Sequence, residues 1–269
     1  MQIIISPAKQ MLADADTFAP VGIPPFPDKT ARIVEELQDI ERDQGAQALQ
    51  NLWNVSDRLL GLSLDALHRF RPIAHEADLA EPCTASRVSP ALFSYHGLQY
   101  RHIAPTVLDQ HALSWLNDHL WILSGLYGCV RPFHAVQPYR LEMGAKLAID
   151  GARNLYGYWG DALARTVTEH DRTVVNLASV EYAKALLPHL DKDVAVVTCI
   201  FAESVRNGKP RQVSGASKAA RGTMVRWLAE QQTDDAAIIE RFDIGYKVAG
   251  ELGHMSADRR ERTVVFVKQ

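Results

Sequence analysis

The chain has 269 residues, of which 47% are hydrophobic and 23% are charged, and its formal net charge is −3 at pH 7. This composition is that of a globular protein long enough to bury a substantial core, and it excludes a protein whose large overall positive charge drives nucleic acid binding. No stretch of about 18 residues lacks charge or strong polarity, and the N-terminal segment shows no leader pattern, so we expect a cytoplasmic protein without membrane association.

The N-terminal half predicts one strand and several helices. The run QIIIS, residues 2–6, is apolar and rich in β-formers, and it predicts a strand that stops at Ser6 and Pro7, where a helix could begin. The proline-dense residues 20–29 predict a loop, and residues 30–49 predict a helix. Residues 48–70 predict two helices separated by a tight turn at 61–63.

The C-terminal half alternates strands and helices. Residues 172–179, 193–205 and 262–269 are β-branched apolar runs that predict strands. Asn207-Gly208 is a strong hairpin signal. Helices are expected over 161–170, 180–190 and 217–232. We therefore predict an α/β fold, of the mixed α+β kind, in which residues 1–269 form a single compact domain around a mixed central sheet.

The familiar catalytic and cofactor motifs are absent from the sequence. The chain has no GxxxxGK[ST], GxGxxG, GxSxG or HExxH pattern, and Ser6 and Lys9 match the spacing of a lysine-activated serine without that class's other motifs. Cys83, Cys129 and Cys199 lie far apart, and no histidine has a carboxylate partner at metal-ligand spacing. We therefore predict no metal site and no cofactor.

Basic residues are concentrated in one region near the C-terminus. Residues 204–229 contain six basic side chains and no acidic one. On a helix over 217–232, Lys218 and Arg221 lie away from the apolar face, and Gly222 among them could bring the backbone close to a phosphate. A solvated basic helix face is the alternative interpretation.

The segment LSGLYGCVRPFHAVQPYRLEMG, residues 123–144, combines glycines, prolines and charge. Gly125 and Gly128 could let two helices meet through a tight turn that offers backbone N–H groups to a DNA phosphate, as in helix-hairpin-helix modules. Glu142 could form a buried ion pair with Arg140, or it could act as a catalytic carboxylate. The spacing alone does not decide between these alternatives.

Several motifs occur in the order and spacing of one protein family. They are ISPAK, SDRLLGL, the 123–144 block, NLYGYWGD, VVNLASVEYAKAL, KAARG and VVFVK. On these motifs the chain resembles the YaaA family of bacterial peroxide stress proteins over essentially its whole length. The resemblance implies an undivided α/β fold with a helix-hairpin-helix-like element, a positively charged cleft, binding of double-stranded DNA, and a role in limiting iron-driven damage during peroxide stress.

The resemblance also implies which residues form the site. The matching basic residues, which we expect to contact DNA, are Lys9, Arg58, Arg131, Arg140, Lys218 and Arg221, with Arg58 in the place of a lysine. Other matching residues that suggest a shared pocket are Glu142, Asp161, Asn176, Ser179, Glu181, Tyr182 and Lys184. The chain departs from the family's pattern at His96 and Ala219, where lysine is usual, and at Leu98 and Val180, where aspartate is usual.

Two functions from different classes follow. The first is a protein that binds the backbone of duplex DNA through a basic cleft. The alternative is an enzyme acting on a nucleotide or another small anionic ligand, in which Arg131 and Arg140 hold the anion and Lys184 or Glu142 handles the proton. A structural role without any site is the third possibility.

Overall fold

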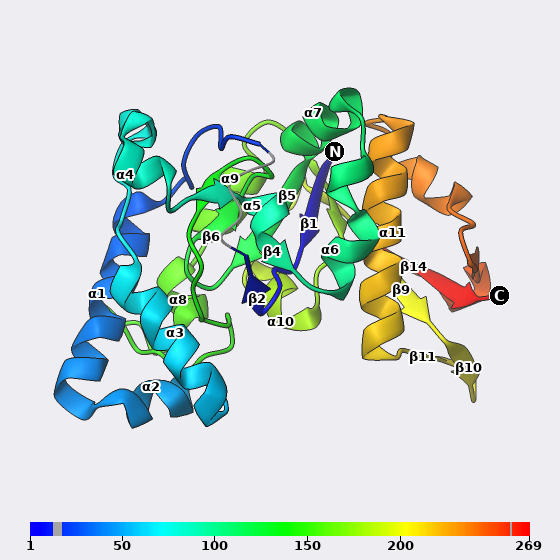
Figure 1. Cartoon of the computed structure of the whole chain (residues 1–269). Coiled ribbons are helices and arrows are strands. Elements are labelled where there is room, and N and C mark those ends of the chain that lie inside the picture. The colour runs from blue at the N-terminus through cyan, green and yellow to red at the C-terminus, as the bar shows by residue number, and fades with distance from the viewer. Residues whose placement is uncertain (13–17, 259) are drawn as a thin grey trace.

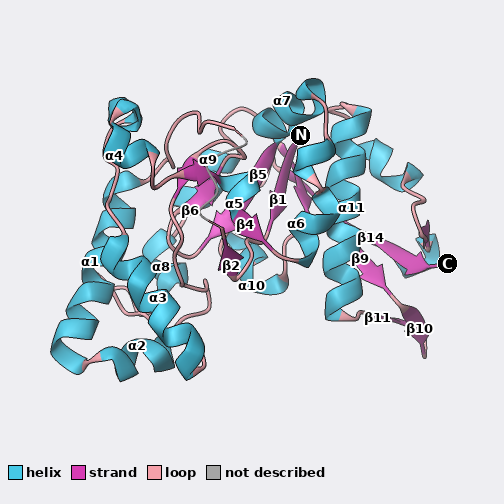
Figure 2. Ribbon diagram, viewed as in Figure 1, coloured by secondary structure: helices cyan, strands magenta, loops and turns pink. Residues whose placement is uncertain are grey.

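The computed structural model describes residues 1–12, 18–258 and 260–269 and has a mixed sheet at its centre (Figures 1 and 2). The strands of this sheet follow the order β12–β14–β9–β8–β1–β5–β6, and β13 pairs with β14. The pairs from β14 to β5 along this order are parallel, whereas β5–β6, β12–β14 and β13–β14 are antiparallel. The mixed α/β fold with surrounding helices confirms the predicted fold class.

The elements have the following bounds. The strands of the central sheet are β1 (Gln2–Ile5), β5 (Leu120–Ser124), β6 (Gly128–Val130), β8 (Thr173–Asn176), β9 (Ala195–Ala202), β12 (Tyr246–Val248), β13 (His254–Met255) and β14 (Glu261–Lys268). The short paired strands are β2 (Gln10–Met11) with β4 (Tyr95–His96), β3 (Ser89–Pro90) with β7 (Ala135–Val136), and β10 (Ser204–Arg206) with β11 (Lys209–Arg211).

The α-helices are α1 (Pro27–Gln44), α2 (Ala46–Trp53), α3 (Asp57–Arg69), α4 (Pro82–Ala85), α5 (Ala91–Ser94), α6 (Leu98–Ile103), α7 (Gln110–His119), α8 (Leu155–Trp159), α9 (Ala162–Val167), α10 (Val180–Ala183) and α11 (Ser214–Gln231). The 3₁₀ turns are η1 (Glu76–Ala80), η2 (Pro105–Val107), η3 (Leu187–His189), η4 (Ala236–Arg241) and η5 (Gly250–Leu252). Helices α1 to α3 lie at one end of the molecule, and α6 and α11 run side by side toward the other (Figure 1).

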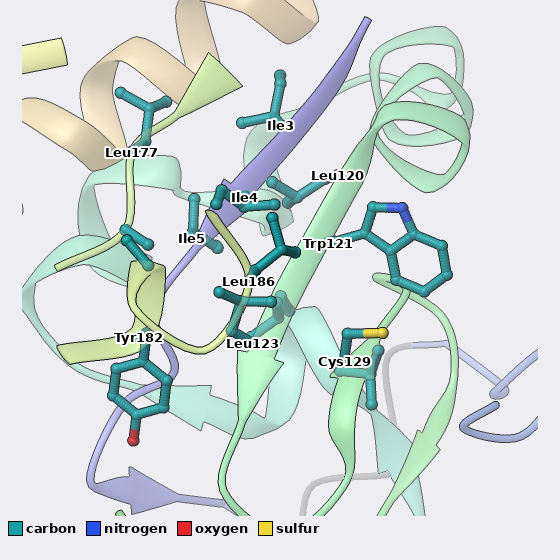
Figure 3. Close-up of a cluster of buried hydrophobic side chains, with 14 of the residues drawn as sticks. Ile3, Ile4, Ile5, Leu120, Trp121, Leu123, Cys129, Leu177, Tyr182 and Leu186 are labelled. Atoms are coloured by element: carbon teal, nitrogen blue, oxygen red, sulfur yellow. The ribbon is translucent and has the colours of Figure 1, made fainter. Parts of the chain in front are cut away.

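Strand β1 is the centre of the core. It pairs with β8 on one edge and β5 on the other, and Ile3, Ile4 and Ile5 are fully buried. Figure 3 shows these side chains beside Leu120 of β5 and close to Leu186, which follows β8 in the chain. Parallel strands covered on both faces need continuous apolar runs, which explains why QIII has no polar alternation.

The expected helix after Ser6 is absent. Residues 7–9 form an irregular segment that leads into β2, and β2 pairs with β4. The Ser6 hydroxyl accepts a hydrogen bond from the backbone N–H of Ser179 at 2.8 Å instead of capping a helix. The prediction failed because a contact with a distant segment satisfies this serine.

The helical breaks between residues 30 and 70 also differ from the prediction. The first helix ends at Gln44 with Gly45 as its C-cap, and the next break lies at 54–56, whereas Gly61 is inside α3. Ser63 does not cap a helix, because its hydroxyl donates to the carbonyl of Leu59 one turn earlier. Helices α2 and α3 therefore form a pair joined by a short turn at a different place.

The turn at Gly125 joins two strands rather than two helices. Strands β5 and β6 pair antiparallel, with Ser124 opposite Gly128, and the Ser124 hydroxyl accepts from the N–H groups of Leu126 and Tyr127. The helix-hairpin-helix interpretation of this segment is wrong. Pairing of β5 with the buried strand β1 explains why the segment before the turn is extended.

The C-terminal predictions agree more closely with the structure. The three predicted strands are β8, β9 and β14, and Asn207-Gly208 forms the turn of the β10–β11 hairpin with φ values of 50° and 70°. Helix α10 is shorter than expected because it ends at Ala183. None of the helices that the structure describes is long and apolar enough to cross a membrane.

Candidate functional site

A cavity of about 510 Å³ opens at the carboxyl ends of β1 and β8. Ser6 directly follows β1 and Ser179 follows β8, and both line this cavity. After β1, the next strand of this sheet along the chain is β5, which pairs with the edge of β1 away from β8. After β8, the next strand is β9, which pairs with the edge of β8 away from β1. The connections that follow β1 and β8 therefore leave this strand pair in opposite directions. In open α/β sheets, ligands bind in the crevice at such a point.

Ser6 and Ser179 form the floor of the cavity. The two hydroxyl oxygens lie 3.1 Å apart, and the Ser6 hydroxyl also accepts from the Ser179 N–H. The buried Tyr100 donates its hydroxyl to the carbonyl of Ser6 at 3.0 Å. Burial raises the pKa of Tyr100 well above its ordinary value, so this phenol remains a donor.

One wall carries two cations that share a carboxylate. Glu142 Oε1 lies 2.8 Å from Lys9 Nζ and 2.9 Å from Arg140 Nη2. Arg140 also donates to the carbonyl of Lys9 at 3.3 Å, and its buried Nε has no hydrogen-bond partner. Glu142 therefore forms a part-buried ion pair with Arg140, one of the two alternatives for this residue, and it positions both cations at the cavity.

The opposite wall comes from α11, where Ser214, Lys218 and Arg221 recur at helical spacing and line the cavity. Lys218 is exposed, whereas Arg221 is half-buried and its buried Nε has no hydrogen-bond partner. Burial lowers the pKa of Arg221, with the Cys199 thiol opposing this shift. Within residues 1–12, 18–258 and 260–269, no carboxylate forms an ion pair with Arg221.

Gln99, on α6, is a further residue of the cavity lining with an unsatisfied donor. Its side chain lines the cavity, is only 6% exposed, and leaves Nε2 without a hydrogen-bond partner. Helix α6 brings Gln99 against α11 because Gly222 has no side chain: a Cβ there would lie 2.1 Å from the carbonyl oxygen of Gln99. Gly222 therefore allows close helix packing, and its predicted approach to a phosphate is wrong.

Three of the sequence-predicted basic residues lie outside the cavity. Arg131 stacks 3.8 Å from the ring centre of Trp121 and donates to Gln2 and to the carbonyl of Asp118. Lys184 lies 5.3 Å from the ring centre of Tyr156. Arg58 is exposed in the first turn of α3. Arg131, Arg140 and Lys184 therefore do not form one pocket, which corrects that part of the enzyme hypothesis.

Other predicted residues fall into two groups. Glu142, Ser179, Glu181 and Tyr182 line the cavity, as the shared-pocket expectation requires. Asn176 is buried and bonds to Thr198 and Ala178, and Asp161 pairs with Arg165 on the surface. Gln99, Tyr139 and Ser214 also line the cavity and were not predicted from the sequence, and the signal for Gln99 was a polar residue on the packed face of a short helix.

Two departures from the family's pattern fall in the cavity wall. His96 and Leu98 both line the cavity, whereas Val180 is 85% exposed. The replacement of a lysine by His96 and of an aspartate by Leu98 removes one positive and one negative charge from the cavity lining, which leaves its formal net charge unchanged when histidine is counted as neutral. Over the described part of the chain, no group of three or more His, Cys, Asp or Glu side chains is arranged to hold a metal ion.

The fold and the cavity together define a mixed α/β protein with a cationic pocket at the carboxyl edge of its parallel strands. The family model described as "Peroxide stress protein YaaA" matches residues 1–252, and the chain belongs to this family. A UPF0246 protein of Lactiplantibacillus plantarum is 40% identical over 243 residues, which cover 90% of this chain and 91% of the relative. UPF0246 proteins of Desulfitobacterium hafniense and Pediococcus pentosaceus are 37% and 38% identical over 269 residues, which cover 100% of this chain and 98% of each relative.

Proposed function

We propose that this member of the peroxide stress family binds the phosphate backbone of duplex DNA at the mouth of the cationic cavity. The observation that carries the proposal is convergence: Lys9, Arg140, Lys218 and Arg221 come from three distant segments and line one cavity. Because these residues are spread from residue 9 to residue 221, only the tertiary fold can bring them together. Convergent cations of this kind suit a polyanion.

The exposed cations are those that a duplex reaches first. Lys9 has a side chain that is 62% exposed, and Lys218 is also exposed, whereas Arg140 is only 12% exposed. Phosphate contacts by such side chains fix the position of a duplex without reading its sequence. The proposal therefore includes binding without sequence preference.

Two neighbouring surfaces extend the proposed contact. The β10–β11 hairpin, which precedes α11, carries the exposed Arg206, Lys209 and Arg211. Helix α3 lies beside Pro138 and Arg140, where its residues line a small shared cavity, and it presents Arg58 in its first turn. In this proposal the α2–α3 pair takes the place of the helix-hairpin-helix-like element, and coating of DNA limits iron-driven damage to it.

Binding of a fluorescent duplex, followed by anisotropy at about 50 and 200 mM salt, tests the proposal. We expect tight binding that weakens steeply with salt, and Lys218→Ala weakens it and lowers the salt slope by about 0.9 for the lost phosphate contact. Lys192→Ala is the matched control, because Lys192 is exposed at the amino end of β9, the opposite edge of the sheet. No binding at low salt, or equal effects of the two variants, contradicts the proposal.

A second candidate is the binding or conversion of a small anionic molecule. The observation that favours it is the volume of about 510 Å³, which lies within the range of small-molecule sites. Arg140 remains available to hold the anion, but Glu142 already bonds to both Lys9 and Arg140. Saturable binding of a small anion with no affinity for duplex DNA would favour this candidate over the first.

A further inference from the structure

We infer that the cavity holds one nucleotide unit, with its phosphate against α11 and Gln99 and its nucleoside against the floor and the neighbouring residues Glu181 and Tyr182. The inference rests on the proposed function, since it assigns the interior of the cavity whose mouth is proposed to meet DNA. A duplex cannot enter, because its major groove alone is about 12 Å wide. A volume of about 510 Å³ is suited to a single nucleotide.

The wall formed by α11 and Gln99 carries the positive charges and hydrogen-bond donors that a phosphate requires. Ser214, Lys218 and Arg221 lie on one face of the first two turns of α11, and this helix has no side-chain cap and no acidic residue in its first turn. The free N–H groups and the dipole at this end therefore favour an anion. Lys218 and Arg221 add two positive charges.

The unsatisfied donors in this wall are the independent evidence for a ligand. Gln99 is more than nine-tenths buried and lines the cavity with Nε2 unpartnered, and the buried Nε of Arg221 is also unpartnered. Buried polar groups almost always have hydrogen-bond partners, and a buried donor without a partner costs about 1–3 kcal/mol of stability. Both nitrogens are covered by protein atoms in this structure, so each side chain has to turn toward the cavity, where a phosphate has enough acceptor oxygens to satisfy both donors.

The lining formed by the floor and the start of α10 differs in chemistry from the α11 wall and favours a ligand larger than phosphate. It presents the hydroxyls of Ser6, Ser179 and Tyr182 and the carboxylate of Glu181, whose Oε1 accepts from the N–H of Gly144 at 2.9 Å. Among the described residues, Gly144 is the one hydrogen-bond donor to the Glu181 side chain. Hydroxyls and a carboxylate match the sugar hydroxyls and amino groups of a nucleoside, which an inorganic anion lacks.

The nucleotide has two possible sources with the same chemistry. It is either a free nucleoside monophosphate or a nucleotide that leaves the end or the stack of a bound DNA strand. Extruding a paired nucleotide costs a few kcal/mol, and the cost is smallest when that nucleotide is already unpaired. The two sources can therefore be distinguished by comparing the affinity for free nucleotides with the affinity for DNA that carries an unpaired nucleotide.

The test uses Gln99→Leu in the full chain, with Lys192→Ala as the control. Calorimetric titrations use a 2′-deoxynucleoside 5′-monophosphate of each base, the matching nucleoside and inorganic phosphate; anisotropy uses a matched duplex and a duplex with one unpaired 5′-phosphorylated nucleotide. We expect the wild type to bind a monophosphate or the unpaired duplex more tightly than phosphate or the matched duplex. Gln99→Leu should weaken that binding by about tenfold or more, as expected for a lost hydrogen bond to a charged group.

Three outcomes separate the inference from simpler explanations. Gln99→Leu should not lower thermal stability, because leucine removes an unsatisfied donor without leaving a cavity, and matched-duplex affinity should stay within about twofold. Phosphate that binds as tightly as every monophosphate, or a variant with unchanged affinity for both nucleotide probes, overturns the inference. If the wild type does not bind the matched duplex but does bind monophosphates, the proposed function is overturned and the nucleotide site is retained.

Discussion

The hydroxyl oxygens of Ser6 and Ser179 lie 3.1 Å apart, although 173 residues separate them in the chain. Each serine stands just beyond the carboxyl end of a parallel strand, and the two strands are neighbours in the sheet. This contact ties the irregular segment after β1 to the start of α10. It therefore fixes the floor of the cavity and the direction in which the segment from Ser6 to Lys9 leaves β1.

Ser6→Ala should lower the free energy of unfolding by about 1–2 kcal/mol, because it removes the acceptor of the part-buried Ser179 N–H. Ser179→Ala is the matched control: it removes one hydroxyl but leaves that N–H bonded to Ser6, so its loss should be smaller. Urea unfolding followed by circular dichroism measures both. Equal losses for the two variants would show that the N–H bond contributes little.

Arg131→Ala should reduce stability by about 2 kcal/mol without changing duplex affinity. The guanidinium loses its stack on Trp121 and its bonds to Gln2 and Asp118, and none of these contacts faces the cavity. Burial already lowers the pKa of Arg131 to about 10, which reflects this enclosed position. Thermal unfolding and anisotropy on the folded variant check both parts. A tenfold loss of duplex affinity at unchanged stability would show that Arg131 contacts DNA.

The contrast between Arg131 and Arg221 marks the limit of the sequence analysis. Both are basic residues in strong motifs, yet one stacks on Trp121 and the other lines the cavity. The deciding contacts come from residues far away in the chain, so spacing cannot reveal them. The strands at 172–179 and 262–269 were predictable because a buried parallel strand requires a continuous apolar run, a local property.

The same limit applies to turns. The hairpin at Asn207-Gly208 was predictable because its backbone needs positive φ at both residues, which these residue types tolerate. The turn at Gly125 also carries a glycine signal, although a weaker one, and pairing of β5 with β1 decides that strands flank it. Glycine indicates where the chain turns, whereas tertiary packing decides which elements the turn connects.

Gly222→Ala should destabilise the protein by about 1–3 kcal/mol, because the added methyl would lie 2.1 Å from the carbonyl oxygen of Gln99, which is backbone and cannot rotate away. Gly61→Ala is the control within another helix: nothing lies within 4 Å of a Cβ there, so the substitution should stabilise α3 by about 0.5–1 kcal/mol. Urea denaturation of both variants gives the comparison. A neutral Gly222→Ala would mean that α6 and α11 separate easily.

Stability should fall as the pH drops from about 6.5 to about 4 because of His134. Burial, with the nearby charge of Arg131, lowers the pKa of His134 from 6.5 to about 4. The unfolded state therefore binds a proton in this window that the folded state does not, and about 2–3 kcal/mol present above pH 6.5 is lost on acidification.

His134→Asn tests this assignment, because asparagine keeps an acceptor for the N–H of Arg131 but does not titrate. Urea unfolding is measured for both proteins from pH 7.5 down to 4.5. The wild type should lose more stability than the variant as the pH falls. A difference between the two proteins that stays constant over this range would assign the acid sensitivity to other groups.

His96→Lys should strengthen duplex binding. His96 lines the cavity at a position where the family usually has lysine, so the substitution adds a permanent positive charge to the cavity that Lys218 and Arg221 also line. One further phosphate contact should steepen the dependence of log affinity on log salt by about 0.9 and tighten binding severalfold at low salt. His111→Lys adds the same charge on the exposed face of α7, which leads into the amino end of β5, and should leave the slope unchanged. If both variants raise the affinity equally, the gain reflects total charge, and the cavity is not where the duplex binds.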